Sequence, residues 1–185
     1  MPQPILVSFL ASANGPWRIN RIDPVIGETL APASRLTMLE MPVPAGIQVD
    51  WVLRGATGNT RYTTRTETDA LAAVQQGLSR PQATCAALIP IRKSEAWWIL
   101  AQDERRTILE EQSRHIALGL RVLPGVARRL HHSRELGEPF DFLTWFEYAP
   151  EDSDAFEALV ADLRATPEWR YVDREVDIRL SSIPA

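Results

Sequence analysis

The sequence is poor in cysteine and histidine, and this scarcity excludes several kinds of site. Its 185 residues include one cysteine, Cys85, so neither an intrachain disulfide nor a cysteine-based zinc site can form. The three histidines, His115, His131 and His132, leave little room for a multi-histidine metal site. The Gly-x-Gly-x-x-Gly, P-loop, Gly-x-Ser-x-Gly and His-Glu-x-x-His patterns are all missing, which removes the usual signatures of nucleotide sites, serine hydrolases and zinc proteases.

An excess of positive charge and a long apolar run are missing as well. Twenty basic and 24 acidic residues give a net charge of −4, which does not favour binding to nucleic acid or to an anionic membrane. The apolar run near the N-terminus, residues 4–11, is far shorter than the roughly 20 residues that span a bilayer. No lysine or arginine precedes this run, so we interpret it as a buried strand rather than a signal peptide, and we expect a cytoplasmic protein.

The first half of the chain is rich in predicted strands. Its apolar stretches predict strands over residues 5–11, 17–23, 49–54 and 60–64, with a hairpin turn at 55–59. Residues 24–44 contain four of the fourteen prolines and are expected to be irregular around one short apolar piece. Thr66, with Asp69 three residues later, predicts the capped start of a helix.

The second half has clearer periodicity. It predicts strands over residues 84–91, 126–133, 142–148 and 171–180, and helices over residues 103–123 and 151–165. The later helix should bury one apolar face, formed by Phe156, Leu159, Val160 and Leu163. The last strand alternates apolar and charged residues, which is typical of a half-exposed strand.

The order of these elements predicts the fold class. The second half gives β-α-β-β-α-β, which is the order of a ferredoxin-like unit, and the first half is expected to be a shortened copy. At about 150 residues per domain, the length fits one domain or two small fused halves. We therefore predict an α+β protein of two ferredoxin-like halves, residues 1–80 and 81–185, packed sheet to sheet around a cavity as one structural unit.

His115 is the most informative single residue. It lies late on the predicted helix 103–123, and Gly119, four residues on, shares its helical face. A glycine inside a helix costs about 1 kcal/mol relative to alanine, so it invites a packing reason. One interpretation is that bare backbone beside the imidazole admits a large flat ligand. The alternative is a surface histidine with an incidental glycine.

Two adjacent arginines and two adjacent histidines occupy the predicted strand 126–133. Arg128 and Arg129 should point to opposite faces, so one of them faces a cavity or the partner layer. A buried guanidinium is costly unless it meets an anion, although such pairs more often form a solvated face or a salt bridge. His131 and His132 also point oppositely and are more typical of structural histidines.

Three further features could contribute to a site. Trp97 and Trp98 cannot both face the same core, so one could line a pocket, although core plus interface is the alternative. Residues 59–62 could offer polar groups to a carboxylate or phosphate, or form a plain turn. Glu168 precedes the last strand and could orient a histidine through its second ring nitrogen, whereas an isolated glutamate is more often solvated.

Taken together, these segments resemble the chlorite dismutase family of haem proteins, and its short lineage in particular. The most specific feature is His115 followed thirteen residues later by Arg128. The resemblance is carried by residues 95–98, 103–106, 111–115, 123–133 and 140–148, and more loosely by 24–30 and 59–62. It implies two ferredoxin-like halves that form a dimeric α+β barrel, with haem b in the C-terminal half.

The resemblance also assigns the iron-binding side of the site. It implies that His115 is the proximal haem ligand, with Glu168 on its other ring nitrogen and Lys93 supporting that glutamate. Glu175 is the alternative carboxylate if the loop alignment shifts. Trp97 would pack near the haem.

Further implications concern the propionates, the opposite side of the haem, and the reaction. Asn59 and Tyr62 would reach a propionate. Arg128 would be the distal residue, which holds an anion near the iron while chlorite is converted to chloride and dioxygen. A homodimer is expected, since the short lineage is usually dimeric whereas longer relatives form pentamers.

Other functions remain open at this point. One is a coproporphyrin-haem decarboxylase, although members of that branch resemble longer chains and generally lack the distal arginine that Arg128 would be. A second is a dye-type peroxidase, and a third is a haem-binding or sensing dimer without turnover. The last is a ferredoxin-like oligomerisation module that binds no haem.

Overall fold

Eight antiparallel strands close into a barrel in the computed structural model, which describes residues 4–41, 43–57 and 62–183. The order around the barrel is β1-β3-β2-β8-β5-β7-β6-β4. The strands are β1 (Leu6–Ser12), β2 (Trp17–Ile26), β3 (Arg35–Leu39), β4 (Trp51–Ala56), β5 (Cys85–Lys93), β6 (Ala127–His132), β7 (Phe142–Tyr148) and β8 (Val172–Ser182). The chain therefore has a mixed α+β fold, and its first four strands and its last four strands form two adjacent parts of one barrel.

The two halves of the barrel meet along two unequal seams. Strands β2 and β8 pair over a long stretch, from Trp17 opposite Ser182 to Ile26 opposite Glu175. The other seam joins β4 to β6 through one residue pair, Ala56 and His132. Gly55 permits this approach, because a Cβ there would lie 2.6 Å from the Cβ of His131. A side chain at position 55 would force the two strands apart and open the barrel at its shorter seam.

The barrel interior is filled by side chains that alternate along each strand. Phe9 of β1, Trp145 of β7 and Ile178 of β8 all point inward and are fully buried. The rest of this core comprises Val7, Leu36, Leu53, Ala86, Leu88, Phe140, Leu143, Val176 and Leu180. The inside of the barrel is therefore a packed core, and a large ligand must bind elsewhere.

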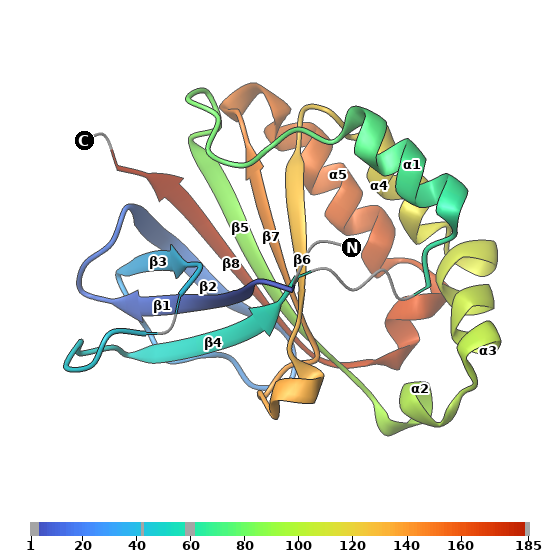
Figure 1. Ribbon diagram of the computed structural model, residues 1–185, viewed down its shortest axis with the longest axis horizontal. Helices are drawn as coiled ribbons and strands as arrows, with labels where there is room; N and C mark the ends of the chain where they lie inside the picture. Colours follow the sequence, from blue (N-terminus) through green and yellow to red (C-terminus); the bar gives the residue numbers. More distant parts are fainter. Residues whose placement is uncertain (1–3, 42, 58–61, 184–185) are drawn as a thin grey trace.

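The helices cover the outer face of the C-terminal strands, whereas β1, β3 and β4 carry no helix on their side (Figure 1). They are α1 (Arg65–Val74), α2 (Glu95–Ile99), α3 (Gln102–Arg106), the π-helix η1 (Thr107–Gln112), α4 (His115–Arg121), α5 (Ser153–Arg164), and the 3-10 turns η2 (Arg134–Leu136), η3 (Pro150–Asp152) and η4 (Pro167–Tyr171). A second apolar cluster forms under α5. None of the helices in the described part of the chain is long and apolar enough to cross a bilayer.

Much of the predicted element order is confirmed. The C-terminal strands lie within a few residues of their predicted positions, and the buried residues of α5 are the predicted Phe156, Leu159, Val160 and Leu163. Within residues 24–44, β2 continues through Pro24 to Ile26, and β3 is the short apolar piece.

The predicted turn at residues 55–59 is wrong at its start, and residues 58–61 of the predicted hairpin lie outside the described part of the chain. Strand β4 continues through Gly55 and Ala56, which pair with β1, and Thr63 and Thr64 are not in a strand. Helix α1 begins at Arg65, and its cap, Thr64, lies two residues before the predicted cap, Thr66. Its capping box joins Thr64 and Glu67, each side chain accepting a hydrogen bond from the other residue's backbone N–H.

Strand β8 is also not half-exposed as predicted. Its alternating charged residues, Glu175, Asp177 and Arg179, are buried beneath α5, and Val176, Ile178 and Leu180 face the barrel core. Alternation along a strand assigns residues to its two faces but does not show that either face is exposed to solvent. Here the charges are buried because oppositely charged side chains of α5 meet them.

Candidate functional site

A break in the helical segment presents His115. The predicted single helix 103–123 is instead α3, the π-helix η1 and a separate helix α4, and Arg114 between them has the left-handed φ of 54°. His115 is therefore the first residue of α4, not a late residue of a long helix. π-helical turns widen the backbone and are frequent at functional sites.

The start of α4 is capped from the preceding turn. The carboxylate of Glu110 in η1 accepts hydrogen bonds from the backbone N–H groups of Ile116 and Ala117, at 2.7 and 3.3 Å. These are amides that a helix start leaves without an intrahelical partner. Because the capping carboxylate lies six and seven residues upstream, a local sequence motif cannot reveal it, and this explains why the helix break was missed.

His115, Glu168 and Lys93 form one buried chain of hydrogen bonds. The Nδ1 atom of His115 lies 2.7 Å from Oε2 of Glu168, and Nζ of Lys93 donates to Oε1 of the same carboxylate at 2.7 Å. The Glu168 backbone N–H donates to Oγ of Ser113, which ties η4 to the end of η1. The side chains of Glu168 and Lys93 are each 4% exposed, whereas that of His115 is 28% exposed.

The electrostatics of this chain keep Glu168 ionised. Burial on its own would raise the pKa of Glu168, but the charges of His115 and Lys93 and their hydrogen bonds outweigh it and lower that pKa to about 2. An ionised carboxylate only accepts hydrogen bonds, so the proton between the two residues lies on Nδ1 of His115. For Nε2 of His115, no partner occurs among the described residues.

The imidazole borders a cavity of about 650 Å³, which is within the range of cofactor and ligand sites. The cavity lies between α1, α4 and the outer face of β6 and β7. Leu71, Ala72 and Gln75 line it from α1, His115 and Ile116 from α4, and Leu130 and Thr144 from the sheet. Apolar side chains combined with polar and charged groups are typical of a cofactor or ligand pocket.

Arg128 and Arg129 point to opposite faces of β6, as their adjacent positions predict. Arg129 points into the barrel, where it donates to Glu40 at 2.6 Å and to Nε2 of His131 at 3.2 Å. Arg128 lies on the outer face and lines the cavity, and its guanidinium has no hydrogen-bond or ion-pair partner in the described part of the chain. Burial lowers the pKa of Arg128, although an arginine remains charged at any ordinary pH.

Gly119 has a packing reason in the structure, and the predicted one, room for a large flat ligand beside the imidazole, stays a prediction. A Cβ at Gly119 would lie 2.6 Å from Nη1 and 3.0 Å from Cζ of Arg128. The bare backbone one turn after His115 therefore makes room for the guanidinium of Arg128.

The two adjacent tryptophans occupy different environments, as predicted. Trp97 is fully buried and lines the cavity, and Nζ of Lys93 lies 4.7 Å from the centre of its ring. Its Nε1 atom is buried without a hydrogen-bond partner among the described residues. Trp98 points away, where Nε1 donates to Asp141 and the ring stacks on Phe142.

The segment before α1 closes the same end of the cavity. The Tyr62 ring meets Trp97 edge to face at 6.0 Å, and its backbone has the positive φ of 73°. Arg106 holds this segment by donating to the Tyr62 carbonyl at 2.5 Å and to the Glu67 carboxylate. Asn59, the other predicted member of this group, lies outside the described residues. The two arginines at 105–106 lie in one of the segments that resemble the family, but no sequence pattern links Arg106 to Tyr62 or Glu67.

The alternative carboxylate, Glu175, does not contact His115. It is fully buried and binds Arg164 and Trp169 instead. Of the two candidate glutamates, the structure places Glu168 beside the imidazole.

Comparisons with known proteins agree on one family. The family model for chlorite dismutase matches residues 36–183. The crystal structure of a dimeric chlorite dismutase from Nitrobacter winogradskyi is 54% identical, with 96% of this chain and 99% of that chain covered and a TM-score of 0.89. A mutant chlorite dismutase from Candidatus Nitrospira defluvii is 27% identical over 74% of this chain and 56% of that chain, with a TM-score of 0.60.

A curated chlorite dismutase from Ideonella dechloratans is 37% identical over 86 residues. This match spans 46% of the chain and 28% of the relative, so the similarity covers less than a third of that longer protein. The family match, in contrast, includes most of the barrel and every element that lines the cavity. The chain belongs to the chlorite dismutase family.

Proposed function

We propose that this chain is a haem b enzyme that converts chlorite to chloride and dioxygen. The observation that carries the proposal is the state of His115. Its Nδ1 hydrogen-bonds to an ionised glutamate, its ring lines the cavity, and its Nε2 has no protein partner among the described residues. A histidine that donates from Nδ1 to a carboxylate can bind a metal through Nε2. The matched relatives described above are all named chlorite dismutases.

The residues around the cavity suit haem b. No group of three or more His, Cys, Asp or Glu side chains that could hold a metal occurs in the described part of the chain. This suits haem b, because the porphyrin supplies other ligands of the iron and one histidine from the protein is enough. The buried N–H of Trp97 lacks a partner, and a propionate would satisfy it. Tyr62 and Asn59 are the further candidates for propionate contacts.

The proximal residues would set the basicity of the iron ligand. Glu168 accepts the Nδ1 proton and pushes electron density onto the imidazole. Lys93 balances the charge of that buried carboxylate, which would otherwise be costly to bury. The hydrogen bond from Glu168 N–H to Ser113 fixes the carboxylate against the turn from which His115 emerges.

Arg128 would hold the substrate anion. When bound, haem supplies the redox chemistry that breaks the chlorine–oxygen bonds and joins two oxygen atoms. The guanidinium carries a permanent positive charge at the edge of an apolar cavity, where it attracts chlorite and retains anionic products. No described side chain binds the guanidinium, so it is available to an anion in the cavity.

The same proposal includes two related halves of the fold, a homodimer and a cytoplasmic location. We infer that residues 1–80 and 81–185 are related ferredoxin-like halves, since the strand order is β4-β1-β3-β2 in one and β8-β5-β7-β6 in the other. A homodimer is supported by the dimeric relative from Nitrobacter winogradskyi. The cytoplasmic location stays a prediction.

Oxygen release tests the proposed function. The protein is reconstituted with haemin, its Soret band is recorded, and chlorite is added on an oxygen electrode. We expect a fast burst that approaches one dioxygen per chlorite. A normal Soret band with bleaching and no oxygen would contradict the proposal and favour the decarboxylase, peroxidase or haem-carrier alternatives.

A further inference from the structure

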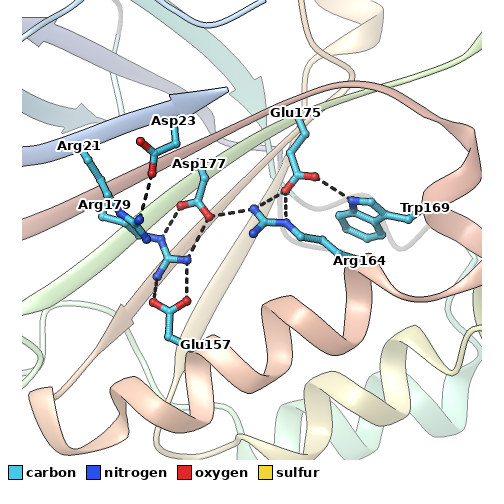
Figure 2. Close-up of polar contacts among 8 residues, drawn as sticks. All are labelled: Arg21, Asp23, Glu157, Arg164, Trp169, Glu175, Asp177 and Arg179. Atoms are coloured by element: carbon cyan, nitrogen blue, oxygen red, sulfur yellow. Dashed lines mark hydrogen bonds and ion pairs between the residues drawn. The ribbon is translucent and has the colours of Figure 1, made fainter. Parts of the chain in front are cut away.

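A buried network of charges lies between β8 and α5, next to the candidate site (Figure 2). Glu175, Asp177 and Arg179 follow one another at alternate positions on the face of β8 that α5 covers. From α5, Arg164 and Glu157 meet them. The network holds three carboxylates and two guanidiniums, so nearly every buried charge has an opposite neighbour.

The network has an outer end and an inner end. At the outer end, Arg179 binds Asp177 and Glu157, and the side chain of Glu157 is 54% exposed. The Arg21–Asp23 pair of β2, at 3.0 Å, lies beside this end and is also largely exposed (Figure 2).

The inner end reaches an indole. Arg164 donates through Nε and Nη2 to Oε1 of Glu175, at 2.8 and 2.6 Å, and through Nη2 to Asp177 at 2.8 Å. The other oxygen of Glu175, Oε2, accepts the Nε1–H of Trp169 at 2.7 Å. The indole is thus fixed by a fully buried carboxylate whose own position is fixed by Arg164 (Figure 2).

Trp169 connects this network to the proximal residues in two ways. It directly follows Glu168 in η4, so holding its side chain restrains the backbone that carries the carboxylate. Its ring also lies 5.4 Å from Nζ of Lys93, the cation that binds Glu168. A cation over an aromatic face is attracted to it, so Trp169 helps to place Lys93 as well.

Glu168 and Glu175 share one design. Each is buried, and each divides its two oxygens between a cation and an aromatic N–H: Lys93 and His115 for Glu168, Arg164 and Trp169 for Glu175. Glu175 therefore holds the indole N–H of Trp169 in the way that Glu168 holds Nδ1 of His115.

We propose that Trp169 and Glu175 are positioning residues for the His115–Glu168 pair. They act through Lys93 and the η4 backbone. Glu175 does not line the cavity, whereas Trp169 does, so Glu175→Gln is the variant that isolates this role from direct contact with a ligand. Loss of the Trp169 N–H or of the Glu175 charge removes the hydrogen bond that fixes the aromatic ring at position 169. Lys93, whose Nζ lies over that ring, is then less well placed. The Glu168–His115 hydrogen bond then weakens, and the imidazole becomes a less basic ligand. As far as it concerns the iron, this inference rests on the proposed function.

Two variants and one matched control test the proposal. Trp169→Phe keeps an aromatic ring but removes the N–H, and Glu175→Gln keeps the shape but removes the charge. Asp177→Asn breaks the same network at Arg164 and Arg179 without touching Trp169. If the network matters only for stability, the control is as harmful as the two test variants.

The main readout is the iron–histidine stretching band of the ferrous haem-loaded protein, measured by resonance Raman spectroscopy. We expect it to move to lower frequency in Trp169→Phe and Glu175→Gln, and to stay in place in Asp177→Asn. Haem transfer to apomyoglobin should be up to about tenfold faster in the two test variants, the lower end of the effect of removing a ligand's own hydrogen-bond partner. Neither readout requires chlorite turnover.

Several results would overturn the inference. An unmoved band in both test variants, or the same shift in all three proteins, would remove the positioning role. A wild-type iron–histidine band without oxygen release would sink the proposed function but leave this inference to be judged by the variants. If wild type gives no such band, amide exchange across residues 166–171 of the apoprotein decides: exchange in Trp169→Phe that is no faster than in Asp177→Asn contradicts the proposal.

Discussion

Two histidines of this chain are held in opposite ways, and the difference separates a structural imidazole from a candidate ligand. His131 points into the barrel from β6 and is fully buried, with the Phe9 ring edge-on at 5.1 Å. Its Nδ1 lies 3.0 Å from the carbonyl of Leu143, and Nε2 accepts from Nε of Arg129 at 3.2 Å. The protein therefore uses both ring nitrogens of His131, with the proton on Nδ1.

His115 also uses Nδ1 for a hydrogen bond, but it has only one partner. Glu168 holds Nδ1, and no described residue occupies Nε2, which faces the cavity. The environments also differ in charge. Burial, and secondarily the nearby Arg129, lowers the pKa of His131 to about 4, whereas His115 faces an anion. The capacity of a histidine to bind a ligand therefore depends on which ring nitrogen the fold leaves unused, rather than on burial or on sequence context.

The largest contrast is expected when each histidine is replaced. His115→Ala should weaken haem binding by at least about a hundredfold, beyond the range seen when only a ligand's hydrogen-bond partner is removed. It should also cost the apoprotein about 1–3 kcal/mol of stability, because the buried carboxylate of Glu168 loses a hydrogen-bond partner and keeps only Lys93. His131→Phe should cost a similar amount, about 1–3 kcal/mol, because buried hydrogen bonds are lost, but haem should still bind.

Haemin titration followed at the Soret band, together with urea unfolding of the apoproteins, measures both quantities. An unchanged haem spectrum in His115→Ala would refute the ligand assignment, and equal haem loss in both variants would remove the distinction between the two histidines.

The sequence could predict what depends on periodicity and could not predict what depends on distant partners. The inward face of α5 and the opposite directions of Arg128 and Arg129 follow from the 3.6- and 2-residue periods alone. The break before His115 does not, because its cap comes from Glu110 across a π-helical turn.

The charged face of β8 shows the same limit. The sequence pattern of an alternating strand is the same whether its polar face contacts water or a helix. Only Arg164 and Glu157, supplied by a helix ahead of it in the chain, make burial of Glu175, Asp177 and Arg179 possible. Which of Glu168 and Glu175 contacts His115 likewise depends on the path of η4 in space, which the order of residues in the sequence does not determine.

A second expected effect is a loss of stability in mild acid that comes from His131. Its pKa is about 4 in the folded protein and about 6.5 when unfolded, so between these values the unfolded chain binds more protons. Stability is therefore fully present above pH 6.5 and falls as the pH drops toward 4, by up to about 3 kcal/mol. Buried carboxylates with lowered pKa, such as Asp177, lose their contribution only at the acid end of this window and below it.

Urea unfolding at a series of pH values between 7 and 4 measures this loss. In His131→Phe, the fall between pH 6.5 and 4.5 should largely disappear, while the steeper loss at lower pH remains. Parallel curves for wild type and His131→Phe across this window would show that the buried imidazole does not titrate as the comparison requires.

The adjacent arginines of β6 repeat the contrast on a smaller scale. Arg128 has no described partner for its guanidinium and faces the cavity, whereas Arg129 is engaged by Glu40 and His131 inside the barrel. Arg128→Ala should lower chlorite turnover roughly tenfold, the lower end for loss of one charged hydrogen bond, and leave stability intact. Arg129→Ala should lower stability by about 1 kcal/mol and leave turnover near wild type.

Oxygen-electrode rates at saturating chlorite and urea midpoints measure both effects. A slow Arg129→Ala enzyme beside a fast Arg128→Ala enzyme would reverse the assignment of the two faces, because the charge that meets the substrate would then lie inside the barrel.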